Sequence, residues 1–473
     1  MIFFKHKYLP YLTLFILVLL SRLPFLWAGY GIEEDSWGIA LEAYNSHTSG
    51  IFEPSRLPGH PVQELFFTAI WGSGNVVFNF TCTFFSAIAV VFFALILNHF
   101  KFKYYFLAAL AFAFVPVFFI SSTYTIDFTW SEAFVLISLY LLLKEQLIFS
   151  GILLGLAIGC RITSGAMLIP FLIIIWQQNI WKINFLNLIK LSIPMGLVAI
   201  ISFIPIIQKY GFSFFMYYDQ FPYPSQAKFI YKLIFGVWGF VGTVSIGICL
   251  FLVFFNRKAQ VVGSLFENVL NKKIILASIV VLILFFISYI RLPQKSGYMI
   301  PVIPFVILLF GYYLNAKNFK FLCIALIVSP FLCSINLTDK LRGAEYSEYA
   351  ITYNVSGQEL FFDVFSGPVF SDYSKRKQKL KYTSEVITYA DKIKVKTVII
   401  AGWWYNEIMV EHIGISKNAL VVFESYINQD KMNEYIQKKC SIYYLPEQNL
   451  YNDLMFKMDV TDLLAKPFVL IRY

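Results

Sequence analysis

Residues 76–98 read VVFNFTCTFFSAIAVVFFALILN, and this stretch decides the fold class because it contains no charged side chain. A run of about 17–25 mostly apolar residues has the length of a helix that crosses the hydrocarbon core of a bilayer. Similar runs recur on both sides of it, from Tyr8 to Asn336. Hydrophobic residues make up 58% of the chain and charged residues only 14%, whereas soluble domains carry roughly 45–50% and 25%. The sequence therefore predicts a polytopic α-helical membrane protein.

These runs predict about eleven transmembrane helices, two of them short. The expected helices fall near residues 8–28, 76–98, 104–122, 128–143, 147–160, 164–178, 186–208, 229–255, 274–290, 298–314 and 320–336. The first run is followed by Ser21-Arg22-Leu23-Pro24, where a signal peptide would have small residues at a cleavage site. We therefore interpret it as an uncleaved helix.

The formal net charge of +10 is distributed unevenly along the chain. Short cytoplasmic loops are rich in Lys and Arg, which assigns one set of loops to the cytoplasm. This set contains Lys5, Lys7, Lys101, Lys103, Lys144, Lys182, Lys190, Arg257, Lys258, Lys272, Lys273, Lys317 and Lys320. The acids of the membrane part gather on the other side, at Glu33, Glu34, Asp35, Glu42, Glu53, Glu64, Asp127 and Asp219. This segregation favours an extracytoplasmic site that needs carboxylates. The sequence has no basic run with interleaved aromatic residues, so it does not indicate nucleic-acid binding.

The composition changes after residue 340, where charges become frequent and long apolar runs stop. Strand-like segments alternate there with helical ones, which predicts a small α/β domain over residues 341–473. The expected strands are 396–401, 419–424 and 441–445, and the expected helices are 405–412 and 429–438. An odd number of helices before it places this domain outside the cytoplasm. The six cysteines lie far apart without CxxC spacing, which is typical of buried apolar residues and not of a disulfide or zinc framework.

The first extracytoplasmic loop, near residues 29–75, opens on the three consecutive acids Glu33-Glu34-Asp35. The apolar positions behind them follow i, i+3, i+4, i+7 spacing: Trp37, Ala40, Leu41 and Tyr44. This spacing predicts an amphipathic helix that lies at the membrane surface. Acids also suit the macrodipole at a helix start, so plain helix-start electrostatics is the alternative to a functional acidic site.

The same loop continues as PSRLPGHPVQE at residues 54–64. Its prolines and glycine predict a rigid turn, which would present Arg56, His60 and Glu64 towards the acidic helix. An ordinary loop is the alternative interpretation.

Three later positions also carry charges next to apolar segments. A charged carboxylate at Asp127, between two apolar segments, costs free energy unless it has a partner or a function. Asp127 could also simply cap the helix that follows. Arg161 follows Gly155-Leu-Ala near the outer surface, where a guanidinium can bind phosphate through two parallel bonds or simply snorkel. The loop from Arg291 to Lys295 is either a second basic element or an ordinary connection.

In their order and topology, the motifs within residues 1–340 resemble the GT-C superfamily of membrane glycosyltransferases. These enzymes use polyprenyl-phosphate-linked sugars, and they include protein O-mannosyltransferases and the aminoarabinose transferase that modifies lipid A. The motifs are Glu34-Asp35 after the first helix, Arg56-x-Pro-Gly-x-Pro61, Asp127 after the third helix, Gly155-Leu-Ala-x-x-x-Arg161, and a basic loop before a Pro-x-x-Pro helix (Lys295 to Pro304).

The resemblance implies an inverting transfer of a sugar from a polyprenyl-phosphate donor to a hydroxyl of a glycan, lipid or protein acceptor. The reaction would take place on the extracytoplasmic side of the plasma membrane, which in a bacterium is the inner membrane, with the N-terminus in the cytoplasm. Family members often have Asp-Glu or Asp-Asp in the first loop, whereas this chain has Glu33-Glu34-Asp35. Asp35 is the first candidate for the base and Glu34 the second.

The resemblance also implies roles for the other charged positions. Arg161, together with Arg56 or Lys295, would hold the donor phosphate, and His60, Glu64 and Arg291 would lie at the substrate site. Asp127 would orient Asp35, the acceptor or a divalent cation. A metal remains an open question, because some members of the superfamily bind one and others need none.

Two other functions are compatible with a multi-helical membrane protein. A transporter or flippase of a lipid-linked anion would have charges near the bilayer midplane, on helices broken there. A polysaccharide polymerase or ligase would place its basic residues in a large later loop. The charges of this chain gather instead at helix ends and in one early loop, which favours the glycosyltransferase.

Overall fold

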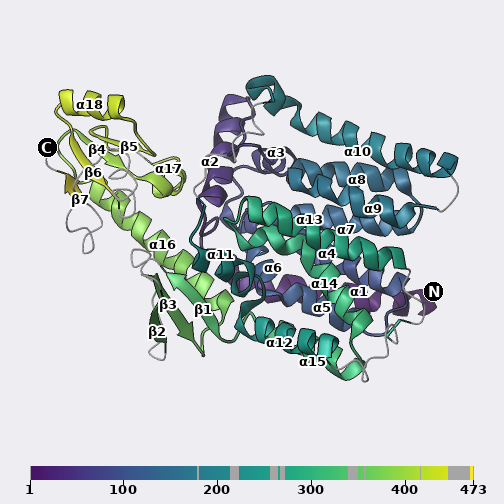
Figure 1. Ribbon diagram of the computed structural model, residues 1–473. Helices are drawn as coiled ribbons and strands as arrows, with labels where there is room; N and C mark the ends of the chain where they lie inside the picture. Colours follow the sequence, from purple (N-terminus) through teal and green to yellow (C-terminus); the bar gives the residue numbers. More distant parts are fainter. Residues whose placement is uncertain are drawn as a thin grey trace.

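The computed structural model describes residues 2–177, 181–212, 223–255, 265–266, 272–338, 350–355, 358–415, 417–445 and 469–471. Residue 178, Asp219, Arg257 and Lys258, which entered the sequence predictions, lie outside these ranges. The helices run side by side in a bundle, and a C-terminal region of strands and helices is attached to one end of it (Figure 1). The N-terminus lies at the opposite end. We call the end that carries α2 (Glu34–Ser49) the α2 end of the bundle.

The membrane part is almost entirely helical. Besides α2 it contains α1 (Ile2–Arg22), α3 (Pro61–Ala69), α4 (Asn75–His99), α5 (Tyr105–Phe114), α6 (Pro116–Ser121), α7 (Phe128–Leu143), α8 (Leu147–Cys160), η2 (Ile162–Met167), α9 (Leu168–Ile175), α10 (Trp181–Tyr210), α11 (Gln226–Leu233), α12 (Phe235–Phe255), α13 (Lys272–Arg291), η5 (Ser296–Val302), α14 (Ile303–Tyr313) and α15 (Ala316–Val328). Among the described residues, six helices are long and apolar enough to cross a membrane, and four further apolar helices are shorter.

The predicted fold class is confirmed, because each expected apolar run contains a helix. The run at 104–122 is divided between α5 and α6 at Pro116, which lacks the amide hydrogen that a continuous helix would use. The prediction of a helix up to residue 336 is wrong. Helix α15 ends at Val328, Pro330 follows, and a strand begins at Ser334.

Small residues allow the central helices to approach closely. α8 packs between α7 and α10, and a Cβ added at Gly151 or Gly155 would lie 2.3 Å or 2.7 Å from a backbone oxygen of α10. The Ser138 hydroxyl of α7 also donates to the backbone oxygen of Ser150 in α8 at 2.7 Å. Glycines and serines at such interfaces are typical of helices packed in a bilayer, where van der Waals contact and hydrogen bonds replace the hydrophobic effect.

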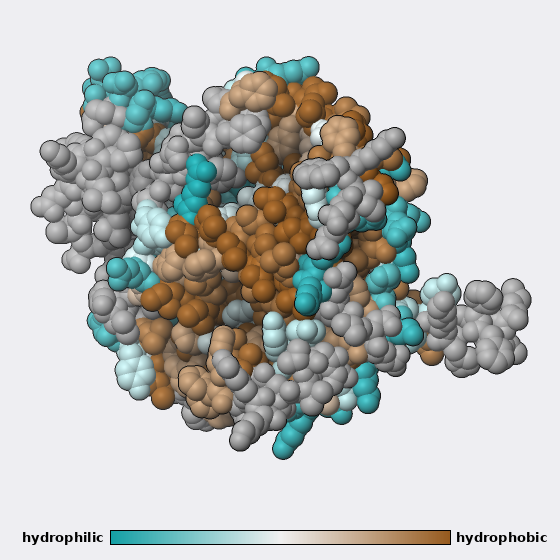
Figure 2. Space-filling view, turned by 45° about the vertical axis from the view of Figure 1, so that its right-hand side comes forward, coloured by the Kyte–Doolittle hydropathy of each residue, from teal (hydrophilic) through white to brown (hydrophobic). Residues whose placement is uncertain are grey.

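The charges separate along the bundle as the sequence predicts. The helix directions place Lys144 after α7 and Lys272 at the start of α13, both at the N-terminal end, whereas Asp127 precedes α7 at the α2 end. Figure 2 shows a broad apolar surface over the helical part and hydrophilic residues towards its margins. Large apolar side chains such as Ile201 of α10 and Phe251 of α12 are exposed, as expected of an integral membrane protein.

The C-terminal region contains two sheets. The strands are β1 (Ser334–Thr338), β2 (Ile351–Val355), β3 (Gln358–Asp363), β4 (Thr397–Ile400), β5 (Val421–Glu424), β6 (Ser441–Tyr444) and β7 (Val469–Ile471), and the helices are α16 (Pro368–Ala390), α17 (Tyr405–Glu411) and α18 (Gln429–Gln437). An antiparallel sheet has the order β1-β3-β2, and a mixed sheet has the order β5-β4-β6-β7, with β4 parallel to both of its neighbours. The predicted strands and helices after residue 396 are confirmed. Strands β1, β2, β3 and β7 and helix α16 were not predicted from the sequence.

Helix α16 joins the C-terminal region to the bundle. Its Arg376 side chain is only 1% exposed and donates hydrogen bonds to the backbone oxygens of Phe25 and Thr123, both at 3.2 Å. It also forms an ion pair with Asp372 of the same helix at 2.9 Å. A buried guanidinium that reaches across in this way fixes α16 against the α2 end of the bundle.

Candidate active site

Five segments meet at the α2 end of the bundle, and each brings a charged side chain. They are the start of α2, the turn at residues 54–60, the start of α7, the α8–η2 junction and the loop between α13 and η5. At three of these places an apolar helix begins or ends, namely α7, α8 and α13. The resulting cluster joins six of the positions singled out in the sequence: Asp35, Arg56, His60, Asp127, Arg161 and Lys295.

Asp35 lies between two cations in the first turn of α2. Its carboxylate is 2.8 Å from the Arg56 guanidinium and is also paired with Lys295. Lys295 contacts Glu33 as well, so one ammonium group holds two acids. Burial acts to raise the pKa of Asp35, but Arg56 and Lys295 outweigh it and lower the pKa to about 2. Asp35 is therefore a permanently charged anchor for the two cations and a weak proton acceptor.

Asp127 forms the buried centre of the cluster, with a side chain that is 0% exposed. Arg161 approaches one carboxylate oxygen at 2.5 Å, and Arg56 approaches the other at 3.2 Å. Burial acts to raise the pKa of Asp127, but the neighbouring cations, Arg161 first, hold it well below its usual range. Arg56 therefore links the two aspartates and gives the cluster a fixed geometry.

The Arg161 guanidinium is also held by aromatic rings. Its central carbon lies 4.4 Å from the ring centre of Phe128 and 5.0 Å from that of Tyr298. These distances are typical of cation–π contacts. The side chain nevertheless remains 12% exposed, so a fixed cation is accessible at the end of the bundle.

His60 is a neutral group at the edge of this cluster. Its Nδ1 lies 2.6 Å from the backbone oxygen of Cys160 and 3.6 Å from the Asp127 carboxylate. Burial lowers the pKa of His60 to about 4, so the ring is uncharged at neutral pH and Nδ1 donates to the Cys160 oxygen. Its Nε2 is buried without a hydrogen-bond partner in the described part of the chain.

Two of the three remaining candidates from the sequence, Glu64 and Arg291, lie apart from the cluster. Glu64 accepts hydrogen bonds from the Ser55 backbone and hydroxyl at 2.9 Å and 2.5 Å, and from the His60 backbone at 3.0 Å. Glu64 therefore closes the turn that carries Arg56, and both of its oxygens are used in this way. Arg291 lies in the exposed last turn of α13, four positions before Lys295.

Glu34 differs from its two acidic neighbours. It forms no hydrogen bond or ion pair with the residues that the structure describes, and it lies partly buried at the start of α2. Burial raises the pKa of Glu34 to about 7, and the adjacent Asp35 charge acts in the same direction. A carboxylate with this pKa can accept a proton at neutral pH and release it again.

Lys379 of α16 was missed by the sequence analysis, although it reaches this end of the bundle. Its ammonium group donates to the Ile32 backbone oxygen at 3.2 Å and pairs with Glu407 of α17 at 3.0 Å. Its positive charge lowers the pKa of Glu34, against the effects of burial and Asp35. No local motif marks Lys379, because it lies among several similar lysines of a polar helix.

Replacing Lys379 with Met should therefore shift the pH dependence of the reaction if Glu34 is the base. Loss of this charge raises the pKa of Glu34 further, so the rise in rate with pH should move to higher pH. The measurement is the pH–rate profile, compared with that of Lys377→Met, which removes an exposed lysine from the same helix. An unchanged profile in Lys379→Met would contradict the electrostatic link.

No metal site is formed by three or more His, Cys, Asp or Glu side chains within the described ranges. The carboxylates of Asp35 and Asp127 are engaged by Arg and Lys side chains.

The fold is similar to that of a protein of known structure. Over 96% of both chains, the structure matches that of ArnT from Cupriavidus metallidurans bound to undecaprenyl phosphate, with 10% sequence identity and a TM-score of 0.54. The apo form of the same protein matches with a TM-score of 0.50, the same identity and the same coverage. No protein-family model and no curated protein sequence matches the chain. The likeness confirms the fold that the motif resemblance implied.

Proposed function

We propose that the chain is an inverting glycosyltransferase that moves a sugar from a polyprenyl-phosphate donor to an acceptor hydroxyl on the extracytoplasmic side of the membrane. The observation that carries the proposal is the cluster itself. Three cations, Arg56, Arg161 and Lys295, surround two carboxylates at the end of an apolar bundle, beside a separate carboxylate whose pKa is near 7. The ArnT-like fold, observed in one case with undecaprenyl phosphate, supports a lipid-phosphate ligand of this kind.

The three cations are suited to the leaving group. Arg161 and Arg56 each present a planar guanidinium that can form two parallel bonds to phosphate oxygens. Both side chains, like that of Lys295, are between 12% and 19% exposed. Their carboxylate partners hold them in place before the donor arrives, so little reorganisation is needed when negative charge develops on the phosphate.

In the proposed reaction, one bond forms at the anomeric carbon of the sugar and one bond breaks there. The acceptor hydroxyl gives its proton to Glu34 as its oxygen attacks the anomeric carbon of the sugar. The bond from this carbon to the phosphate oxygen breaks, and the electron pair leaves with the polyprenyl phosphate. Attack from the face opposite the phosphate inverts the anomeric centre.

This assignment makes Glu34 the base and gives Asp35 a positioning role, which reverses the order favoured by the motif comparison. A base works best when its pKa lies near the working pH. Glu34 meets this condition, whereas the pKa of Asp35 is lowered to about 2 by its two cations. Asp127 would orient Arg161 and Arg56 towards the phosphate.

A charge-conserving substitution at Arg161 tests the donor site. Arg161→Lys keeps a cation beside Asp127 but loses the planar fork, so affinity for undecaprenyl phosphate should fall by about tenfold or more. The affinity is measured by native mass spectrometry of the protein in nanodiscs. Undecaprenol, which has no phosphate, serves as the control ligand, and its binding should be the same in both proteins.

Arg291→Lys tests the other basic position suggested by the sequence. If this variant loses affinity for undecaprenyl phosphate while Arg161→Lys retains it, the phosphate lies at the end of α13 and the proposed donor site is wrong. If neither variant changes the affinity, the cationic cluster does not bind the donor.

A further inference from the structure

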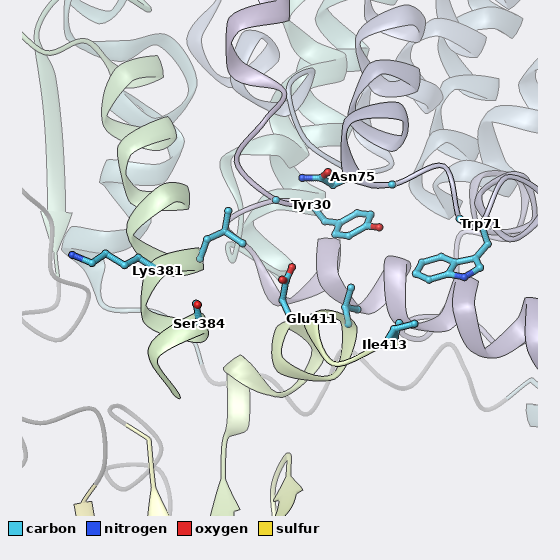
Figure 3. Close-up of a pocket in the computed structure, with 12 residues that line it drawn as sticks. Tyr30, Trp71, Asn75, Lys381, Ser384, Glu411 and Ile413 are labelled. Atoms are coloured by element: carbon cyan, nitrogen blue, oxygen red, sulfur yellow. The ribbon is translucent and has the colours of Figure 1, made fainter. Parts of the chain in front are cut away.

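A second site is suggested by a cavity of about 650 Å³ between the bundle and the C-terminal region. One wall comes from the membrane part, with Gly29 and Tyr30 before α2 and the segment from Trp71 to Asn75 before α4. The other wall comes from α16 and α17. Figure 3 shows the Tyr30 ring, the Trp71 ring and the Glu411 carboxylate around this space, with Asn75 above it. The volume lies within the range of about 300–1,000 Å³ that is usual for small-molecule sites.

The cavity is lined by apolar rings and by groups that form hydrogen bonds. Trp71 and Tyr30 provide aromatic surface, while Glu411, Asn75 and Ser384 provide a carboxylate, an amide and a hydroxyl. A sugar ring has apolar C–H faces that pack on aromatic rings and hydroxyls that bond to carboxylates and amides. A lipid tail would leave the polar groups of this wall without partners.

The cavity is also close to the acidic start of α2. Tyr30 lies four residues before Glu34, and four residues of chain span at most about 14 Å. The connection is held in place, because Tyr30 packs edge-on against Trp37 at 5.2 Å and the Trp37 indole donates to the Gly31 oxygen at 2.8 Å. Tyr30, which lines the cavity, is thus held in a fixed position close in sequence to the start of α2, which carries the proposed base.

We propose that this cavity binds the carbohydrate part of the acceptor, so that the acceptor substrate is a glycan or glycolipid. The inference rests on the proposed glycosyl transfer and specifies its second substrate. The donor phosphate would occupy the cationic cluster, which leaves the cavity with its aromatic rings and its Glu411 carboxylate for the acceptor. Since α16 and α17 form half of this wall, the C-terminal region would determine which glycan is accepted.

Ligand-observed NMR tests the proposal with a mixture of glycans, so no single acceptor has to be chosen. The probe is the pool of soluble oligosaccharides released by mild acid from the envelope glycolipids of the source cells. We expect saturation transfer from the protein in nanodiscs to sugar C–H protons of this pool. Ser384→Trp fills the cavity and should abolish the transfer, whereas Glu411→Gln preserves the shape and should weaken binding by about tenfold for one lost charged hydrogen bond.

Lys377→Trp is the matched control, because it places the same bulk on an exposed position of α16 outside the cavity. It should leave the saturation transfer intact. The proposal is overturned if the wild-type protein gives no saturation transfer, or if Ser384→Trp gives as much as the wild type. Binding of undecaprenyl phosphate is measured on the same samples. If the wild-type protein binds undecaprenyl phosphate but no oligosaccharide, only the proposed acceptor site is wrong. If the wild-type protein does not bind undecaprenyl phosphate, the proposed function fails.

Discussion

Glu34→Gln should lower the rate of sugar transfer by a factor of about 10²–10⁴, the usual contribution of a general base. The substitution keeps the size of the side chain and removes only its ability to take a proton. The assay measures release of polyprenyl phosphate from a panel of polyprenyl-phosphate sugars, because this product is common to every donor. Binding of undecaprenyl phosphate should remain, since Glu34 forms no ion pair with the three cations.

Two further observations separate Glu34 from its neighbours. The base must be deprotonated to act, so the rate of the wild-type enzyme should rise with pH and reach half of its plateau near 7, the pKa of Glu34. Glu33→Gln is the matched control, because it removes an adjacent acid that contacts only Lys295 among the described cations of the cluster. A nearly normal rate in Glu34→Gln together with an inactive Asp35→Asn would instead make Asp35 the base.

Arg376→Met should destabilise the protein by about 3–5 kcal/mol, the usual effect of removing one partner from a buried ion pair. The substitution leaves Asp372 without its cation, and the backbone oxygens of Phe25 and Thr123 lose their donor. The contacts of α16 with the bundle should loosen as a result. We expect a lower midpoint of thermal unfolding and faster protease cleavage between the C-terminal region and the bundle.

Lys377→Met, one position further along α16, is the control for lost charge on this helix. It is exposed and should leave both measurements unchanged. The double variant Arg376→Met, Asp372→Asn should recover part of the stability, because it removes the uncompensated charge. If Arg376→Met unfolds at the wild-type temperature, the buried guanidinium does not hold the two parts together.

The membrane fold could be predicted from the amino-acid sequence, because lipid imposes a simple rule on a chain. Every segment that crosses the bilayer must be apolar and must satisfy its own backbone, so the runs around residues 76–98 could only be helices. The alternation of strands and helices after residue 396 was visible for a similar local reason. Helix α16 could not be recognised in the sequence, because two polar residues interrupt the apolar stripe on its buried face. The polar residues are Arg376 and Thr383, and the apolar ones are Val369, Val386 and Ala390.

The roles of the individual charged residues could not be predicted in this way, because they depend on contacts that form only when the chain folds. Glu33 and Asp35 pair with Lys295, whereas the pKa of Glu34 is lowered by the charge of Lys379, which comes from a helix more than 340 positions away. Their pKa values depend on burial and on charges brought from distant segments, neither of which any local pattern contains. The cavity above α2 likewise exists only because α16 and α17 fold back onto the bundle.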